Sequence, residues 1–229
     1  MKDVLGQALK DYQEGRREHK LYIHNNYGKK ERMPLSIYFR SLKKISELEC
    51  MALEACTGSI LDVGAAAGSH ALVLQKKGLN VTAMDISPGA VEVMQQRGVQ
   101  NIVSDDIFSY KEKKFDTLLL LMNGIGLAGT IDGLQKLLST FKKILKPGGQ
   151  VLFDSSDVAY LFTAANFPLQ HYYGEIDYEY EYREQHSGSF KWLYIDKQTM
   201  QNVALKAGFA MQLLFEDGHD QYLARLQRI

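Results

Sequence analysis

The residues best suited to do chemistry lie in the turn that follows a short apolar run. Residues 60–63 (Ile-Leu-Asp-Val) are mostly apolar and partly β-branched, as is typical of a buried strand in a parallel sheet. Small residues from Gly64 to Gly68 then lead into a helix, so a ligand can approach the N–H groups at the helix start, where the dipole favours negative charge. Asp85 ends the next apolar run, 21 positions beyond Gly64. At this spacing a carboxylate can accept hydrogen bonds from the ribose hydroxyls of a nucleotide.

The positions of the small residues distinguish two classes of nucleotide ligand. A dinucleotide fingerprint, G-x-G-x-x-G, starting at Gly64 would need glycines in place of Ala66 and Ser69. The pattern D-x-G-x-G-x-G fits better, because Asp62, Gly64 and Gly68 are present and Ala66 replaces only the middle glycine. An alanine with a positive φ would be strained by about 1 kcal/mol, so we expect Ala66 to adopt a negative φ.

This pattern resembles that of the class I S-adenosylmethionine-dependent methyltransferases, and the resemblance extends over roughly residues 58–229. Its strongest parts are the segments 61–68 (Leu-Asp-Val-Gly-Ala-Ala-Ala-Gly), 81–88 (Val-Thr-Ala-Met-Asp-Ile-Ser-Pro) and 145–149 (Leu-Lys-Pro-Gly-Gly). The resemblance implies S-adenosyl-L-methionine as the cofactor and methyl transfer to an N, O or C atom of a small-molecule acceptor. A non-catalytic protein that binds S-adenosylmethionine is the alternative. An NAD-dependent oxidoreductase is disfavoured by the glycine register.

The resemblance also implies which residues would hold the methyl donor. The exit loop of the third strand, in the segment 102–108, would offer an acid to the adenine amino group. Asp106 fits that position best, with Asp105 as the alternative, and Ile107 would press on the ring. Both aspartates could instead be ordinary turn residues. The expected cofactor-binding residues are Asp62, Gly64, Ala65, Ala66, Gly68, Asp85, Ile86, Asp106, Ile107, Met122 and Asn123.

The sequence allows two interpretations for each of two polar residues near this site. His70 lies in the first turn of the helix after the glycine turn, where it could bond the donor's carboxylate, but we favour a side chain in solvent. Asn123 follows the apolar run that ends at Met122 and matches a position where some related families use a catalytic Asn-Pro-Pro-Tyr signature. Gly124 and Ile125 replace the prolines, so Asn123 is expected either to contact donor or substrate or to be a plain turn residue.

An aromatic hairpin is expected at about residues 172–195, after the fifth strand. Residues 178–183 (Tyr-Glu-Tyr-Glu-Tyr-Arg) alternate with period two, and a second run, 190–194, follows a short turn. The three tyrosines of the first run share one face, which could shelter a substrate ring or a cationic amine, or could simply pack on the domain. The expected substrate residues are Tyr178, Tyr180 and Trp192.

Residues for acid–base catalysis are harder to assign from the sequence. The chain offers no Ser-His-Asp or His-rich metal-binding constellation, so no metal centre is expected. Alignment of the acceptor with the methyl group would be the main contribution to catalysis. A general base could assist, and the candidates beside the hairpin are His171, Tyr173 and Glu175.

The order of elements predicts an α/β fold. Strands and helices alternate from residue 58 to residue 156, which indicates a doubly wound parallel sheet. The runs 211–215 and 222–226 then form an antiparallel pair. We therefore expect a mostly parallel seven-stranded sheet with an antiparallel last strand, as in the Rossmann-like methyltransferase fold. Residues 58–229 would form the S-adenosylmethionine-binding domain.

Residues 1–57 are expected to form an N-terminal helical arm. Apolar residues at helical spacing mark a first helix near residues 4–12, and the capping-box pattern of Ser46 and Glu49 begins a second helix. The polar stretch 24–32 between them is expected to be an exposed loop. The arm would be a partial lid over the cofactor or would pack on the sheet edge.

Charge and cysteine content restrict the classes of partner. The 229 residues carry 27 Lys and Arg against 27 Asp and Glu, so no overall field favours nucleic acid or an anionic membrane. The longest apolar run, 118–122, is too short to span a bilayer, and the start has no apolar core of signal-peptide length. We therefore expect a cytoplasmic monomer or homodimer, with Cys50 and Cys56 reduced.

Overall fold

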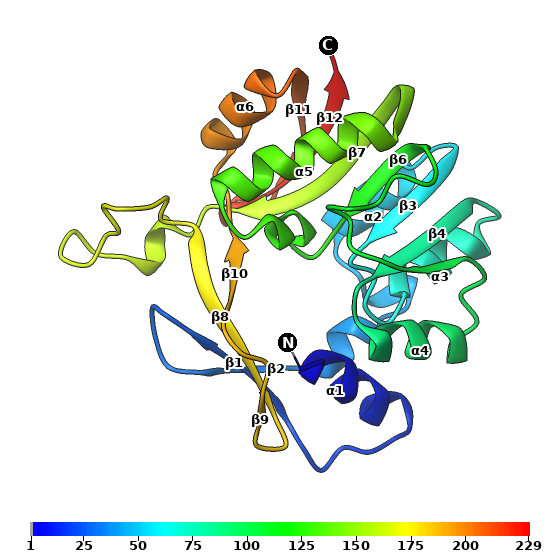
Figure 1. Ribbon diagram of the computed structural model, residues 1–229, viewed down its shortest axis with the longest axis vertical. Helices are drawn as coiled ribbons and strands as arrows, with labels where there is room; N and C mark the ends of the chain where they lie inside the picture. Colours follow the sequence, from blue (N-terminus) through cyan, green and yellow to red (C-terminus); the bar gives the residue numbers. More distant parts are fainter. Residues whose placement is uncertain (1) are drawn as a thin grey trace.

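Two β-sheets organise the computed structural model, which describes residues 2–229 (Figure 1). The larger sheet has seven strands in the order β11-β12-β7-β6-β3-β4-β5. The pairs from β5 to β7 are parallel, and β12 is antiparallel to both β7 and β11, so the expected sheet is confirmed. Its strands are β3 (Ser59–Val63), β4 (Asn80–Asp85), β5 (Ile102–Ser104), β6 (Phe115–Leu120), β7 (Leu145–Ser156), β11 (Phe209–Glu216) and β12 (Gln221–Arg228).

Helices cover both faces of the seven-stranded sheet, as a doubly wound fold requires. On one face, α5 presents a stripe of apolar side chains at helical spacing, including Leu134, Leu138 and Phe141, and α6 packs beside it. On the other face, α2, α3 and α4 enclose a second apolar core with the opposite sides of the strands. The helices are α2 (Glu47–Ala55), α3 (Ser69–Lys76), α4 (Pro88–Gln96), α5 (Ile131–Ile144) and α6 (Lys197–Lys206).

The strand order reverses beside β3. The chain runs from β3 outward to β4 and β5 and then returns to β6 on the other side of β3. In open parallel sheets, ligands bind outside the carboxyl ends of the strands at such a reversal. The topology therefore brings the turn after β3, the end of β4 and the segment after β6 to one edge of the sheet.

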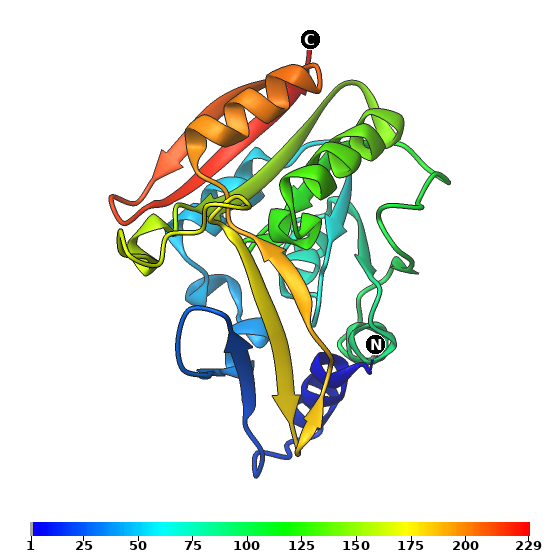
Figure 2. The ribbon, with the colours of Figure 1, turned by 60° about the vertical axis from the view of Figure 1, so that its left-hand side comes forward.

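The second sheet joins the N-terminal segment to the aromatic hairpin (Figure 2). Its strands are antiparallel, in the order β10-β8-β1-β2, with β9 paired to β8. The expectation of an exposed loop at 24–32 is wrong at both ends, which lie in β1 and β2 and leave only residues 26–30 as the loop; Ile23 in β1 pairs with Tyr180 in β8. The strands are β1 (Leu21–Asn25), β2 (Glu31–Met33), β8 (Glu175–Tyr182), β9 (Gln185–His186) and β10 (Phe190–Leu193).

The two faces of this second sheet differ in chemistry. Polar contacts join its strands on the outer face, among them the hydrogen bond of His24 with Glu181 at 2.6 Å and the ion pair of Lys191 with Asp177 at 3.1 Å. Because side chains alternate along a strand, the residues between these point to the inner face. That inner face carries the aromatic residues of β8 and β10. The sheet is therefore amphipathic, with its apolar side turned toward the larger sheet.

Helix α1 (Val4–Gln13) links the second sheet to the larger domain. At its start, Asp3 caps the helix and also accepts a hydrogen bond from the Gly89 N–H at 2.9 Å, at the beginning of α4. The two helices approach closely there, since a Cβ on Gly89 would lie 2.7 Å from the Gly6 Cα. Farther along, the buried Asp11 accepts a hydrogen bond from the Tyr182 hydroxyl of β8 at 2.8 Å. The expected N-terminal arm thus contains helices and two strands.

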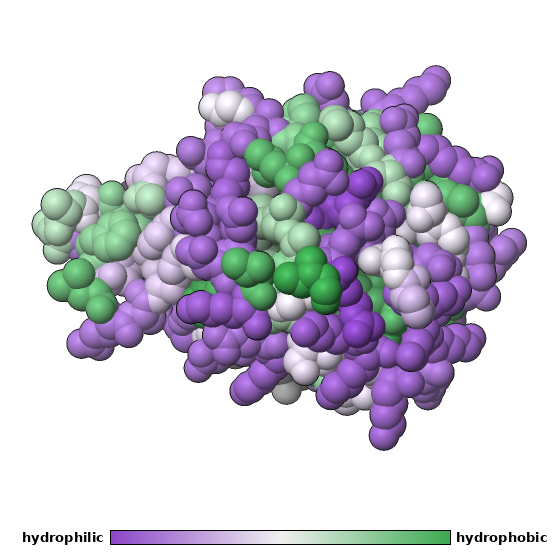
Figure 3. Space-filling model, turned by 90° about the horizontal axis from the view of Figure 1, so that it is seen from above, coloured by the Kyte–Doolittle hydropathy of each residue, from purple (hydrophilic) through white to green (hydrophobic). Residues whose placement is uncertain are grey.

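The face shown in Figure 3 is largely hydrophilic, with scattered apolar patches. A lobe formed by residues 159–170, which begins with η4 (Ala159–Leu161), projects from the body in Figures 1 and 2. It carries the exposed apolar side chains Tyr160, Phe167 and Leu169. Within residues 2–229, no helix has the length and apolar character needed to cross a membrane.

Candidate functional site

A cavity of about 880 Å³ lies between the carboxyl ends of the parallel strands and the inner face of the second sheet. One side is formed by the turn after β3 and by the segments that follow β4, β5 and β6. The other side is formed by residues of β1, β2, β8 and β10, together with η1 (Leu35–Phe39) and the start of α1. This volume is near the upper end of the range for small-molecule sites, so two small ligands can lie side by side.

The turn after β3 presents bare backbone to this cavity. Gly64 has a φ of +71°, and a Cβ there would meet no atom within 4 Å. The prediction of a negative φ for Ala66 is wrong, because its φ is +49°. In this left-handed conformation the Ala66 N–H donates to Asp85 Oδ2 at 2.8 Å. A hydrogen bond to a charged acceptor is worth about 1.5–3 kcal/mol, which can offset the strain of the alanine.

Two carboxylates flank this turn, and burial acts on both. Asp85 accepts N–H groups from Ala66 and, through Oδ1, from Ser87 at 2.9 Å, while burial raises its pKa. Asp62, at the end of β3, is only 2% exposed, and burial raises its pKa to about 6 against the opposing effect of His70. Asp62 lines the cavity, and its buried Oδ2 has no hydrogen-bond partner among the described residues. Such an oxygen calls for a donor from a ligand.

Apolar side chains continue the cavity beyond Asp85. Ile86 is 69% exposed, although it lines the cavity, and Ile107 is buried on the next loop. Asp105 and Asp106 both line the cavity as well, so their positions do not distinguish the two candidates. Each also stabilises the loop, since Asp105 accepts from the Asp106 N–H and Asp106 from the Phe108 N–H.

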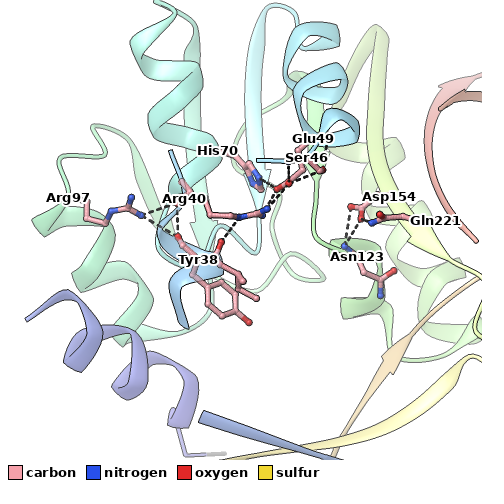
Figure 4. Close-up of polar contacts among 11 residues, drawn as sticks. Tyr38, Arg40, Ser46, Glu49, His70, Arg97, Asn123, Asp154 and Gln221 are labelled. Carbon is pink, nitrogen blue, oxygen red and sulfur yellow. Dashed lines mark hydrogen bonds and ion pairs between the residues drawn. The ribbon is translucent and has the colours of Figure 1, made fainter. Parts of the chain in front are cut away.

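Nine of the eleven expected cofactor residues line the cavity, and the other two, Gly68 and Asn123, do not. Gly68 begins α3 with a φ of +74°, and a Cβ there would lie 2.8 Å from Val99 Cγ2, so its role is to let the helix pack closely. Asn123 also has a positive φ, of 55°. Its N–H donates to the Asp154 carboxylate at 3.0 Å (Figure 4). Its Nδ2 donates to the Leu193 carbonyl at 3.1 Å. Asn123 thus ties the exit of β6 to β10.

A buried charge network that was missed in the sequence lies beside the turn (Figure 4). Glu49 of α2 accepts hydrogen bonds from Arg40 at 2.9 Å, from the Ser46 N–H at 2.8 Å and from His70 at 2.8 Å. Burial alone would raise the pKa of Glu49, but His70, Ser46 and Arg40 lower it to about 2. Burial would lower the pKa of His70, but Glu49 and Asp62 raise it overall. The favoured solvent position for His70 is therefore wrong, because its side chain is buried against Glu49 and lines the cavity.

A second set of contacts holds η1 against the same turn. The Ser69 hydroxyl donates to the Tyr38 carbonyl at 2.6 Å. Arg97 of α4 donates to Ser69 Oγ at 3.2 Å and to the Ala67 carbonyl, and its guanidinium lies 4.9 Å from the centre of the Phe39 ring. The arm therefore has polar and aromatic attachments on both sides of the turn.

Aromatic rings form the opposite wall of the cavity. The hairpin residues expected to meet a substrate, Tyr178, Tyr180 and Trp192, all line it. Phe190 lies between two of them: its ring centre is 5.1 Å from that of Tyr180 and 6.4 Å from that of Trp192. Tyr182, the third tyrosine of the run, packs under α1 instead. The tyrosine face therefore serves both packing and the cavity. The wall rings are Tyr27, Tyr38, Tyr160, Tyr178, Tyr180, Phe190, Trp192 and Tyr194.

The three general-base candidates lie outside the cavity and have other contacts. His171 is exposed and contacts the carbonyl of its neighbour. The Tyr173 hydroxyl donates to Asp157 at 2.8 Å. Glu175 accepts the Ile131 N–H at 3.0 Å, at the start of α5. Glu175 is the first residue of β8 and the other two candidates precede it, but none of the three side chains lines the cavity, so we assign them no catalytic role.

Comparisons with known proteins agree with this geometry. A family model described as a methyltransferase domain matches residues 32–214. A S-adenosylmethionine-dependent methyltransferase from Bacteroides fragilis, solved in complex with S-adenosyl-L-homocysteine, is 39% identical, with a TM-score of 0.93. That match covers 99% of this chain and 95% of the other.

More distant relatives share less of the sequence with this chain. An amino pentose methyltransferase from Micromonospora echinaspora is 14% identical, with a TM-score of 0.59 over 82% of this chain and 93% of its own, and shows the fold alone. Demethylmenaquinone methyltransferase from Tropheryma whipplei is 28% identical over 109 residues, 45% of this chain and 44% of that protein. The match thus spans less than half of this curated relative. Because the family model covers most of the chain, the protein belongs to the methyltransferase domain family, and the expected likeness to class I S-adenosylmethionine-dependent methyltransferases is confirmed.

Proposed function

We propose that this protein transfers a methyl group from S-adenosyl-L-methionine to a small-molecule acceptor. One observation carries the proposal: a single cavity joins the glycine turn, with the unpartnered oxygen of Asp62, to a wall of aromatic rings. The donor would occupy the strand ends and the acceptor the aromatic side. Both ligands would then meet inside one enclosed space.

The chain offers a partner for each part of the donor. Asp85 would accept hydrogen bonds from the ribose hydroxyls, in addition to the two backbone N–H groups that orient it. Asp62 Oδ2 would pair with the ammonium of the amino-acid part, which satisfies its buried charge. Ile86 and Ile107 would enclose the adenine ring, and Asp106 would accept its amino group.

Alignment and exclusion of water would be the protein's main contributions to the reaction. When bound, S-adenosylmethionine supplies a methyl group made electrophilic by its positively charged sulfur. The second sheet would hold the acceptor against that methyl group, because its inner face and the strand ends enclose the same cavity. Orienting the two reactants can lower the activation barrier by up to about 7–11 kcal/mol relative to their free encounter in solution. This contribution requires no proton relay.

We infer that residues 1–57 act as a lid over the donor half of residues 58–229. The first residues of α1 line the cavity, and Asp3 bonds to the Gly89 N–H at the start of α4, next to the proposed ribose site. His70, whose pKa is raised by the neighbouring Glu49, would face the donor's carboxylate from below the arm. The donor would therefore stabilise the closed arm by bridging it to α3.

The proposed setting is a cytoplasmic monomer or homodimer without nucleic-acid partners. Equal numbers of basic and acidic residues support the absence of a nucleic-acid partner. Cys50 and Cys56 are free thiols, which is usual in a reducing compartment. A small acceptor is supported by the volume of the cavity, about 880 Å³, which lies in the range of small-molecule sites.

Methyl transfer is tested by incubating the protein with isotopically methyl-labelled S-adenosylmethionine and small-molecule pools and following the label by mass spectrometry. Once an acceptor is found, Tyr180→Ala and Trp192→Ala should lower its turnover by more than tenfold, because each removes a large apolar contact. The affinity for S-adenosylhomocysteine should stay within about threefold, because the donor meets other elements.

The matched control is Tyr22→Ala, since Tyr22 belongs to the same sheet but lies on its outer face opposite Arg32. Its turnover should stay near that of the parent. Equal losses of donor affinity and turnover in Tyr180→Ala, with a lower melting temperature, would show a packing role only. A protein that binds S-adenosylhomocysteine but labels no acceptor would favour the non-catalytic alternative.

A further inference from the structure

We propose that the acceptor is an amine carried on an apolar or aromatic body, held with its nitrogen near Glu31 and the tyrosines of the aromatic wall. This assignment rests on the proposed methyl transfer and names the acceptor class of the same cavity. It follows from the kinds of ring in the wall, from the position of Glu31 and from the charge of the whole lining.

The wall combines ring faces with neutral hydroxyl groups. The Tyr178 hydroxyl donates to the Tyr194 hydroxyl at 3.1 Å, and Tyr27 lies against Tyr178 in the same cluster. Burial raises the pKa of Tyr178 and Tyr194, and raises that of Tyr27 to about 12, so these phenols stay uncharged. Uncharged aromatic faces attract cations through their quadrupoles, and the attraction grows when water is excluded.

Glu31 places a carboxylate at the end of this wall. Alternation along β2 turns Glu31 and Met33 to the cavity and Arg32 to the outer face. Glu31 Oε1 accepts hydrogen bonds from the Tyr27 hydroxyl and from Asn25 Nδ2, both at 3.2 Å. Glu31 is therefore oriented by its neighbours and keeps Oε2 for a ligand cation.

The charges of the lining favour a cation over an anion. Six carboxylates line the cavity, against two lysines and one histidine. Lys191 directs its ammonium to Asp177 on the outer face, at 3.1 Å, and the His70 ring is hydrogen-bonded to Glu49 at 2.8 Å. An acceptor carrying a carboxylate or phosphate would meet a field of its own sign, which lowers its affinity. The six carboxylates are Asp3, Glu31, Asp62, Asp85, Asp105 and Asp106.

Methylation of an amine suits such a cavity because the transfer step from the neutral amine moves positive charge within the cavity and removes none. After the acceptor nitrogen has released its extra proton to water at the cavity mouth, its lone pair bonds to the methyl carbon. The electron pair of the broken carbon–sulfur bond stays on sulfur. Positive charge thus moves from sulfur to nitrogen, leaving an ammonium product beside a neutral thioether. The rings and Glu31 lie where that new charge would form.

Three probes with the same ring and spacer test the inference: 2-phenylethylamine, 2-phenylethanol and 3-phenylpropionate. Each is titrated by NMR into the protein saturated with S-adenosylhomocysteine. The amine should bind at least tenfold more tightly than 3-phenylpropionate, with the alcohol between them. In Glu31→Gln the preference for the amine over 3-phenylpropionate should shrink to threefold or less. In the control Glu179→Gln, on the outer face of β8, the preference should persist.

The outcomes separate this inference from the proposed function. S-adenosylhomocysteine binding is measured first, and its absence would count against methyl transfer itself. If S-adenosylhomocysteine binds but 3-phenylpropionate binds as well as the amine, or none of the three probes binds, the acceptor class is wrong. A preference that survives unchanged in Glu31→Gln would overturn the role of Glu31. An N-methylated product from 2-phenylethylamine and S-adenosylmethionine would support the inference directly.

Discussion

Replacing Glu49 by Gln should remove a large electrostatic contribution to stability. Glu49 has a side chain only 6% exposed, and its pKa is about 2 instead of 4.5. That difference corresponds to about 3 kcal/mol of folding free energy at neutral pH, because each pKa unit is worth about 1.4 kcal/mol. Glu49→Gln keeps the shape of the side chain but leaves the partly buried Arg40 and the buried His70 without their anion. We therefore expect the free energy of unfolding at pH 7 to fall by about 3 kcal/mol.

The stabilisation by Glu49 should depend on pH in a defined direction. A carboxyl group with a lowered folded pKa stabilises the protein above its unfolded pKa, and this contribution disappears as the pH falls through the folded pKa. The difference between parent and Glu49→Gln should thus be full above pH 4.5, about half at pH 3 and near zero at pH 2. The pKa of His70 should also fall in the variant, because Glu49 is the largest influence that raises it.

Urea unfolding at several pH values measures the stability, and NMR titration of the ring protons measures His70. The matched control is Glu47→Gln, because Glu47 lies exposed in the same first turn of α2. It should change stability by less than about 0.5 kcal/mol. Equal losses for the two variants, or a loss for Glu49→Gln that does not shrink at low pH, would refute the network.

Three more outcomes follow from the cavity and its turn. Because the pKa of Asp62 is about 6, the affinity for S-adenosylhomocysteine, measured by calorimetry, should fall between pH 7 and pH 5 in the parent but not in Asp62→Asn. The same pH dependence of affinity in both proteins would refute the pairing of Asp62 with the ammonium. Ala66→Gly should raise the free energy of unfolding by about 0.5–1 kcal/mol by relieving the positive φ, and a loss in urea unfolding would contradict that strain. In Gly126→Ala the new Cβ would lie 2.1 Å from Trp192 Nε1, so the indole must move. The KM for the acceptor should therefore rise about fivefold or more while the affinity for the donor stays unchanged, and an unchanged KM would exclude Trp192 from the acceptor site.

Local patterns in the sequence were enough to predict the seven-stranded sheet and the turn after β3. Each strand and helix there has its own periodicity, and the chain connects neighbours in order, so short-range signals define the topology. Asp85 could be placed for the same reason, since it ends β4 directly beside the turn. The nine expected cofactor residues that line the cavity come from this locally determined part.

Long-range pairings could not be predicted in this way. β1 was mistaken for part of a loop because its partner, β8, lies more than 150 residues away, as in the pairing of Ile23 with Tyr180. The capping box of Glu49 was visible, but nothing local shows that Arg40 and His70 converge on the same carboxylate. Ala66 was misjudged because the hydrogen bond to Asp85 that offsets its strain is itself a tertiary contact.

The central claim is that one cavity holds the methyl donor against the aromatic wall, and Trp192 provides a direct probe of it. Trp192 is the single tryptophan of the chain and lines the cavity. Titration with S-adenosylhomocysteine should change its fluorescence in a saturable way. Asp85→Ala should weaken the apparent affinity about thirtyfold, since losing hydrogen bonds to a charged acceptor costs about 2 kcal/mol. A response to NAD but not to S-adenosylhomocysteine, or equal affinities of parent and Asp85→Ala, would contradict the account.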